Sequence, residues 1–170
     1  LRIKGEKTVE CDYSSLVARL AYAYVGDRSD AVQPPKGDLY TIPGLSPESR
    51  DGVKRLVSTL LFDQRKNRDR FPKGVAELFK LDDQRKGFKQ VLELINAHHA
   101  AIAPLFGTGI GHYLQFLESQ LLVNVLLRLA QRKIVALPLH DCVVVQERKA
   151  ERVASIMEGT ALGLIGTKIP

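Results

Sequence analysis

The order of apolar and polar residues predicts short strands near both ends of the chain and helices between them. Residues 8–11 have the composition of a strand, and residues 14–25 that of the helix after it. Residues 134–139 and 142–145 are short apolar runs rich in β-branched residues, which predicts a β-hairpin with the two intervening residues at its turn. We expect the first strand and the hairpin to form a small antiparallel sheet.

The middle of the chain has the pattern of several helices. Ser46-Pro47-Glu48 offers a capping hydroxyl, a proline and an early acid, so a helix should start there and run to about Phe62. Further helices are expected at 75–79, 88–102, 111–132 and 149–162. The stretch 111–132 is apolar almost all the way round, which predicts a helix buried on several sides. The expected fold class is therefore α/β of the α+β kind: a helix-rich chain in which helices back a small antiparallel sheet.

Composition narrows the class of protein. The 170 residues are 45% hydrophobic, enough for one ordinary core, and a net charge of +6 favours a polyanionic partner. The most apolar stretch, 121–130, contains Asn124 and Arg128 and is too short to span a membrane. Two cysteines are too few for a disulfide framework, which indicates an intracellular, cytoplasmic setting. The chain opens on Leu1 rather than Met, which suggests a fragment of something longer.

Two carboxylates stand at predicted strand ends, Asp12 after the first strand and Asp141 at the hairpin turn. Carboxylates presented from neighbouring strand ends make a seat for a pair of divalent cations. The helix ending at Phe62 adds a ridge at four-residue intervals, made of Arg50, Lys54, a hydroxyl and the Phe62 ring.

Three short motifs occur in a fixed order along the chain. The first is a strand that ends in Asp-Tyr-Ser and closes on Arg; the second is a helix with Arg, Lys and an aromatic residue; the third is a His-Asp hairpin. They stand here as Asp12-Tyr13-Ser14 through Arg19, then Arg50, Lys54 and Phe62, then His140-Asp141. In this order and secondary structure, the chain resembles the palm region of the DNA polymerase I family (family A) and its single-subunit RNA polymerase relatives.

The block from Pro104 to His140 is also similar to a group of small uncharacterised polymerase-like proteins of bacteria and mobile elements. The resemblance implies one palm-like domain over residues 1–170, with a rudimentary fingers-like helical insertion at about 46–104. It also implies that a thumb-like grip comes from further domains or from a partner protein.

The resemblance implies template-directed nucleotidyl transfer, with two Mg²⁺ or Mn²⁺ ions held by Asp12, Asp141 and the backbone carbonyl of Tyr13. Arg50 and Lys54 would face the nucleoside triphosphate, and Lys54 would protonate the leaving group. Tyr13, Val17 and Phe62 would line the nucleotide site. The other expected partner is a DNA or RNA primer-template, contacted at the primer by His140 and along its phosphates by Arg65, Lys66, Arg68, Arg70 and Lys73.

The chain departs from the family pattern at three positions, one of which bears on the choice between deoxynucleotides and ribonucleotides. Val17 stands where the DNA enzymes usually carry a Glu that excludes ribonucleotides, so sugar selection is open. The aromatic residue of the helical motif is followed by Asp63 instead of continuing into Tyr-Gly, and Cys142 replaces the Glu or Ser that follows the hairpin Asp.

Two other classes of protein fit parts of the pattern. One is a non-catalytic nucleic-acid-binding or replication-accessory module on a palm scaffold. The other is a metal-dependent phosphohydrolase, in which His98 or His99 would add to a His-Asp doublet; that doublet belongs on a helix, whereas here it lies between β-rich runs. Without cysteine or spaced carboxylate partners, His98, His99 and His112 are more typical of a helix surface or of core packing.

Overall fold

The computed structural model describes residues 1–26, 32–65, 68–139 and 141–166. The chain divides into two compact units, one made of Leu1–Leu16 with Gln115–Pro170 and the other of Val17–Leu114. The predicted insertion at 46–104 falls within the second unit.

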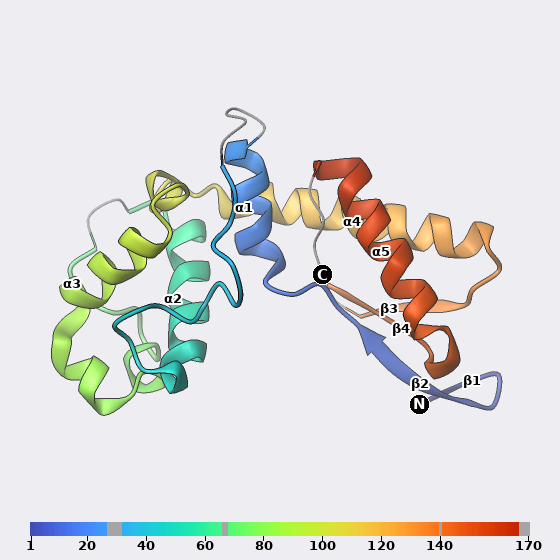
Figure 1. Cartoon of the computed structure of the whole chain (residues 1–170), viewed down its shortest axis with the longest axis horizontal. Helices are drawn as coiled ribbons and strands as arrows, with labels where there is room; N and C mark the ends of the chain where they lie inside the picture. Colours follow the sequence, from blue (N-terminus) through green and yellow to red (C-terminus); the bar gives the residue numbers. More distant parts are fainter. Residues whose placement is uncertain (27–31, 66–67, 140, 167–170) are drawn as a thin grey trace. The chain divides into compact units, whose positions relative to one another are not determined.

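The first unit contains an antiparallel sheet of β1 (Arg2–Ile3), β2 (Glu6–Cys11), β3 (Ala136–Leu139) and β4 (Cys142–Gln146), in the order β1-β2-β4-β3 (Figure 1). The predicted pairing of the first strand with the hairpin is confirmed. The short β1 was not predicted. It joins β2 through Lys4 and Gly5, whose positive φ values of 51° and 80° suit the two central residues of a tight hairpin turn.

Helix α5 (Ala150–Ile165) packs against β2 and β4, and buries Val153, Met157 and Ala161. All five residues of β4 are buried, so this strand has no solvent-facing side. The Tyr13 hydroxyl donates a hydrogen bond to the Met157 carbonyl at 2.7 Å, which ties the end of β2 to α5. The sheet end that carries Asp12 is therefore anchored from one side.

Helix α4 (Gly111–Gln131) differs from its prediction. Its Leu121, Val125 and Leu129 are buried, but Phe116 and Leu127 are 54% and 57% exposed. The expectation of burial on several sides is wrong. A helix that backs a sheet buries one stripe against it, and apolar side chains on the other face of α4 stay about half exposed.

The second unit is helical. It contains α1 (Leu16–Gly26), α2 (Arg50–Phe62) and α3 (Leu81–His98), with 3-10 turns at Pro47–Ser49, Ala76–Leu78 and Ala103–Leu105. The predicted helix from Ser46 to Phe62 is confirmed, with the capping Ser46 hydroxyl accepting from the Glu48 amide. The stretch predicted as a helix at 75–79 is a single 3-10 turn. Helix α3 begins earlier than predicted and bends at Gly87, whose φ is 76°.

Among the described residues, no helix combines the length and the apolar character that a membrane-spanning segment needs.

Gly52 lets α2 approach a buried ring. A Cβ at this position would lie 2.6 Å from Cδ2 of Phe79, which is itself buried. We expect Gly52→Ala to lower the free energy of unfolding by about 1 to 3 kcal/mol, because the ring or the helix must shift. Gly159→Ala in α5 is the matched control: its Cβ would meet nothing within 4 Å, so it should be neutral or slightly stabilising. Chemical denaturation followed by circular dichroism measures both, and equal effects would contradict the packing argument.

Candidate functional site

The two predicted carboxylates lie at the same end of the central strand pair. Asp12 directly follows β2, and Asp141 directly precedes β4. The register pairs Cys11 with Val143, so the next step along the antiparallel ladder brings Asp12 beside the start of β4. Both aspartates are exposed. Continued by one step, the register places Asp12 opposite Cys142, the residue next to Asp141, so the two aspartates stand at the same end of this strand pair.

A third carboxyl group, Glu118 of α4, belongs to the same neighbourhood. Its pKa is raised by burial, then by the negative charges of Asp141 and Asp12. The buried Cys142 thiol is affected by the same negative charges. Its pKa is raised by burial and then by Glu10, Asp12 and Asp141. Acidic side chains from β2, α4 and the hairpin turn therefore lie near one another at this end of β2 and β4.

Sequence reasoning missed Glu118 as a site residue. It belongs to the block from Pro104 to His140 on which part of the resemblance rests, but the sequence assigned it no role, because only the packing of the first unit brings it near Asp12 and Asp141. A polar residue within a strongly apolar helix was the available signal.

The donor set fits a cation only in part. Two exposed carboxylates and the backbone carbonyl of Tyr13 are the predicted ligands. Among the described residues, no group of three or more His, Cys, Asp or Glu side chains is arranged so that it could hold a metal ion. The Tyr13 ring is buried and its hydroxyl is bonded to Met157, so only the backbone of Tyr13 remains for the role predicted for it.

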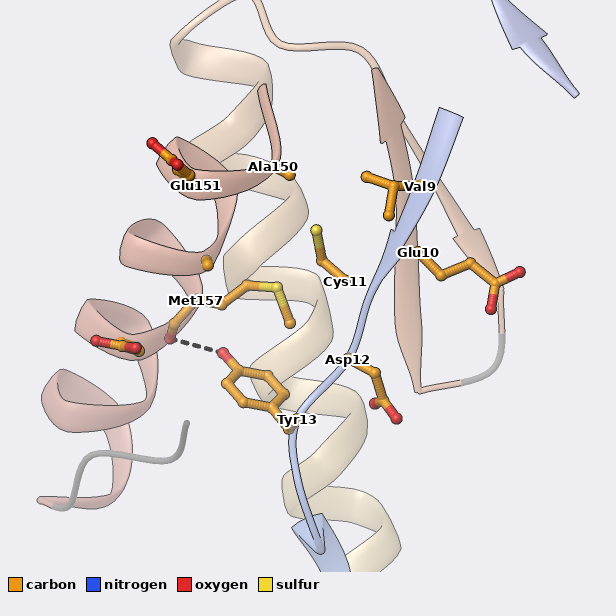
Figure 2. A pocket seen from close by; sticks show the side chains of 10 residues that line it. Val9, Glu10, Cys11, Asp12, Tyr13, Ala150, Glu151 and Met157 are labelled. Atoms are coloured by element: carbon orange, nitrogen blue, oxygen red, sulfur yellow. Dashed lines mark hydrogen bonds between the residues drawn. The ribbon is translucent and has the colours of Figure 1, made fainter. Parts of the chain in front are cut away.

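Figure 2 shows how residues alternate along β2: Cys11 and Tyr13 point toward α5, whereas Glu10 and Asp12 point away from it. On the α5 side lies a largely apolar pocket of about 400 Å³, walled by Val9, Cys11 and Tyr13 from the strand and by Ala154 and Met157 from the helix. The Asp12 carboxylate points away from this pocket. Glu10 and Asp12 nevertheless contribute to its lining, so the pocket borders the acidic end of β2.

In the second unit, part of the α2 ridge of Arg50, Lys54 and Phe62 is held by neighbouring side chains. Arg50 is held by Asp38, with Nε to Oδ2 at 2.7 Å and Nη2 to Oδ1 at 3.1 Å, and its guanidinium lies 5.6 Å from the centre of the Tyr40 ring. Burial acts to raise the pKa of Asp38, but the hydrogen bonds from Arg50 and Thr41 leave it below its usual value. Lys54, one turn later, is exposed.

At the end of α2, Phe62 packs against the start of α4. Its ring lies edge to face on His112, with centroids 5.5 Å apart, and a Cβ at Gly111 would lie 2.5 Å from its Cγ. The ring of Phe62 is therefore half-buried and held by its neighbours.

The basic segment after α2 divides into two groups. Arg65 and Arg68 both bind Asp63, whereas Arg70 and Lys73 are exposed. Two of the predicted nucleic-acid contacts, Lys66 and His140, lie outside the described residues.

The histidines serve packing where the structure describes them. His99 is fully buried, and its Nδ1 lies 2.9 Å from the Tyr22 hydroxyl. Burial lowers the pKa of His99 to about 4, and the neighbouring His98 acts in the same direction. The interpretation of these histidines as packing residues is confirmed for His99 and, against the Phe62 ring, for His112.

Comparisons with models of protein families, with curated proteins and with solved structures found no match to this chain.

His99 should make the second unit sensitive to acid. Because its pKa falls from 6.5 in the unfolded chain to about 4 in the fold, the unfolded state binds a proton in the interval where the native state does not. Stability is therefore complete above pH 6.5 and declines as the pH falls towards 4, by at most about 3 kcal/mol. Urea denaturation between pH 7 and 4 measures the decline.

The control separates His99 from other titrating groups. His99→Gln should start less stable and show a flatter pH profile, whereas His112→Gln, which replaces an exposed side chain, should keep the wild-type slope. An unchanged slope in His99→Gln would show that burial of this ring does not govern the acid response.

Proposed function

We propose that the protein catalyses template-directed nucleotidyl transfer by a two-metal mechanism, as a DNA polymerase-like nucleotidyltransferase. The observation that supports the proposal is that Asp12 and Asp141 stand at the same end of the β2 and β4 pair. Glu118 lies near them, and its pKa is raised by burial and then by the charges of Asp141 and Asp12. Carboxylates brought together by adjacent strands, against mutual repulsion, are a common arrangement for divalent cations in phosphoryl transfer.

In this proposal Asp12, Asp141 and the Tyr13 carbonyl would hold two Mg²⁺ or Mn²⁺ ions. The ions would supply charge neutralisation for the triphosphate and activation of the attacking hydroxyl. Glu118 adds negative charge beside the two aspartates and strengthens cation binding. Lys54, exposed on α2, binds the triphosphate and protonates the leaving pyrophosphate. Arg50 contributes its remaining N–H groups while Asp38 fixes its position.

The proposed partners are nucleoside triphosphates and a DNA or RNA primer-template. Val17 and Phe62 are assigned to the nucleotide, and His140 to the primer. The basic segment from Arg65 to Lys73 is assigned to nucleic-acid phosphates, in keeping with the net charge of +6.

A second candidate function is a non-catalytic nucleic-acid-binding module. The observation that favours it is the lack, among the described side chains, of a three-residue metal-binding group. Such a module would bind primer-template through its basic residues without incorporating nucleotides.

Asp12→Ala and Asp141→Ala should each abolish nucleotide incorporation in a primer-extension assay with Mg²⁺ or Mn²⁺, while the fold survives, because both side chains are exposed. We expect losses of at least about a thousandfold, the scale of removing a metal ligand from a transition state. Glu10→Ala is the matched control, since Glu10 is an exposed acid on the same side of β2 as Asp12 (Figure 2) and is assigned no ligand role.

Incorporation within about tenfold of wild type by either aspartate variant, a loss of under 1.4 kcal/mol, would exclude the two-metal assignment. A wild-type protein that binds primer-template but extends no primer under any metal condition would favour the non-catalytic module instead.

Val17 leads to a prediction about the sugar. An apolar pocket discriminates weakly against an added hydroxyl, by about 1 to 3 kcal/mol. We therefore expect ribonucleotides to be incorporated within roughly a hundredfold of deoxynucleotides, and Val17→Glu to shift the preference towards deoxynucleotides. Competition between the two nucleotides in single-turnover extension measures the ratio. Exclusion of ribonucleotides by more than about 10⁴-fold in the wild type would mean that Val17 does not leave the pocket open.

A further inference from the structure

The C-terminal end of α2 forms a basic pocket of about 380 Å³ within the Val17–Leu114 unit. Three arginines, two hydroxyl residues, one aromatic ring and one carboxylate surround it: Arg55, Ser58, Thr59, Phe62, Asp63, Arg65 and Arg68. Neither Asp12 nor Asp141 takes part in it.

Asp63 organises the arginines of this pocket. One of its oxygens accepts from the Arg65 backbone N–H and from Arg65 Nε, both at 3.1 Å, and the other accepts from Arg68 Nε at 3.1 Å and from Arg68 Nη2. The side chains of Asp63 and Arg68 are only 10% and 12% exposed. The hydrogen bond from Arg68, followed by those from Arg65, lowers the pKa of Asp63 to about 2, so the carboxylate is ionised at every pH relevant to the native protein.

The backbone holds Asp63 in place from both sides. Its N–H donates to the Thr59 carbonyl at 2.8 Å, and its carbonyl accepts from the Gly109 N–H at 2.8 Å. A second bond of the same length joins the Gly107 N–H to the Leu60 carbonyl. The backbone of Asp63 is thus bonded both to α2 and to the segment before α4. The guanidinium groups that bind the Asp63 carboxylate are positioned by it.

After these pairings the pocket lining keeps a net positive charge and guanidinium N–H groups that do not bond to Asp63. Three guanidinium groups face one carboxylate, which leaves two positive charges in the lining. Arg65 uses only Nε on Asp63, and its side chain is 75% exposed. Within the described part of the chain, no carboxylate forms an ion pair with Arg55. An ion pair that only stabilised the segment would need one arginine, so the other two are surplus to that role.

We propose that this pocket binds a dianionic phosphate monoester, held by Arg55, Arg65 and Arg68 with the Ser58 hydroxyl beside them. Two surplus positive charges match the two negative charges of a phosphate monoester, and guanidinium forks match the geometry of its oxygens. The monoester is either a free nucleotide or the 5′-phosphate end of a nucleic-acid strand. The proposal deepens the assignment of Arg65 and Arg68 to nucleic-acid phosphate and does not depend on catalysis.

The test compares ligands that differ only in the monoester. Fluorescence anisotropy measures binding of a thymidine decanucleotide with and without a 5′-phosphate, in the absence of divalent cations, with inorganic phosphate and thymidine monophosphate as competitors. We expect the 5′-phosphate to improve affinity by at least about tenfold, the scale of one charge-assisted contact. If thymidine monophosphate binds but the two decanucleotides bind equally, the ligand is the free nucleotide. Equal binding of the decanucleotides without binding of thymidine monophosphate or inorganic phosphate overturns the proposal.

Variants connect the preference to the pocket. Arg55→Gln and Arg65→Gln alter exposed side chains and should each abolish the preference for the 5′-phosphate. Arg85→Gln is the matched control, because Arg85 is an exposed arginine of α3 outside the pocket and pairs only weakly, at 3.5 Å, with Asp82. A preference that survives both pocket variants overturns the proposal.

The test of the phosphate pocket can be distinguished from the test of the proposed catalysis. Asp12→Ala and Asp141→Ala should keep the full 5′-phosphate preference, since neither residue belongs to the Val17–Leu114 unit. Salt-dependent binding of the unphosphorylated strand reports backbone contacts alone. A wild-type protein that binds the unphosphorylated strand but shows no 5′-phosphate preference and no binding of thymidine monophosphate or inorganic phosphate would therefore refute the pocket and leave the nucleotidyl-transfer proposal standing.

Discussion

The antiparallel pairing of β2 with β4 is the constraint on which the candidate site depends. It joins residues from opposite ends of the chain, and the register that places Cys11 opposite Val143 also places Asp12 beside the start of β4. Burial of β4 on both faces fixes the hairpin, and the hydrogen bond from Tyr13 to Met157 fixes the end of β2. A slip of one residue would turn Asp12 towards α5 and separate the carboxylates, so the register determines the candidate site.

The end of the sheet near Asp12 carries several acidic side chains. Like charges in one neighbourhood are unfavourable, and the fold tolerates them because Asp12 and Asp141 remain exposed to water, which screens them. Glu118 is less exposed, and the cost appears in its raised pKa. Repulsion of this kind contributes nothing to folding.

The second unit uses carboxylates in the opposite way, to position cations. Asp38 holds Arg50 through two hydrogen bonds, and Asp63 holds both Arg65 and Arg68. A guanidinium that is already fixed by one carboxylate loses less conformational freedom when it binds an anion with its remaining N–H groups. Arg50, Arg65 and Arg68 are thus pre-organised. Lys54, Arg70 and Lys73, by contrast, are exposed.

The sequence alone determined what is local: the strand before Asp12, the hairpin around Asp141, the capped helix to Phe62, and hence the antiparallel sheet backed by helices. Periodicity and capping depend on neighbours within a few residues, so they can be interpreted without a fold. Only the tertiary structure decided what depends on distant partners. Periodicity shows which face of α4 is apolar but not whether another element covers it, and Phe116 is exposed as a result. Likewise, no local pattern shows that Glu118 lies near two aspartates, because that encounter arises from packing between segments. The partners of Asp63 are near it in sequence, but the segment that carries them is irregular, so its course could not be predicted from periodicity.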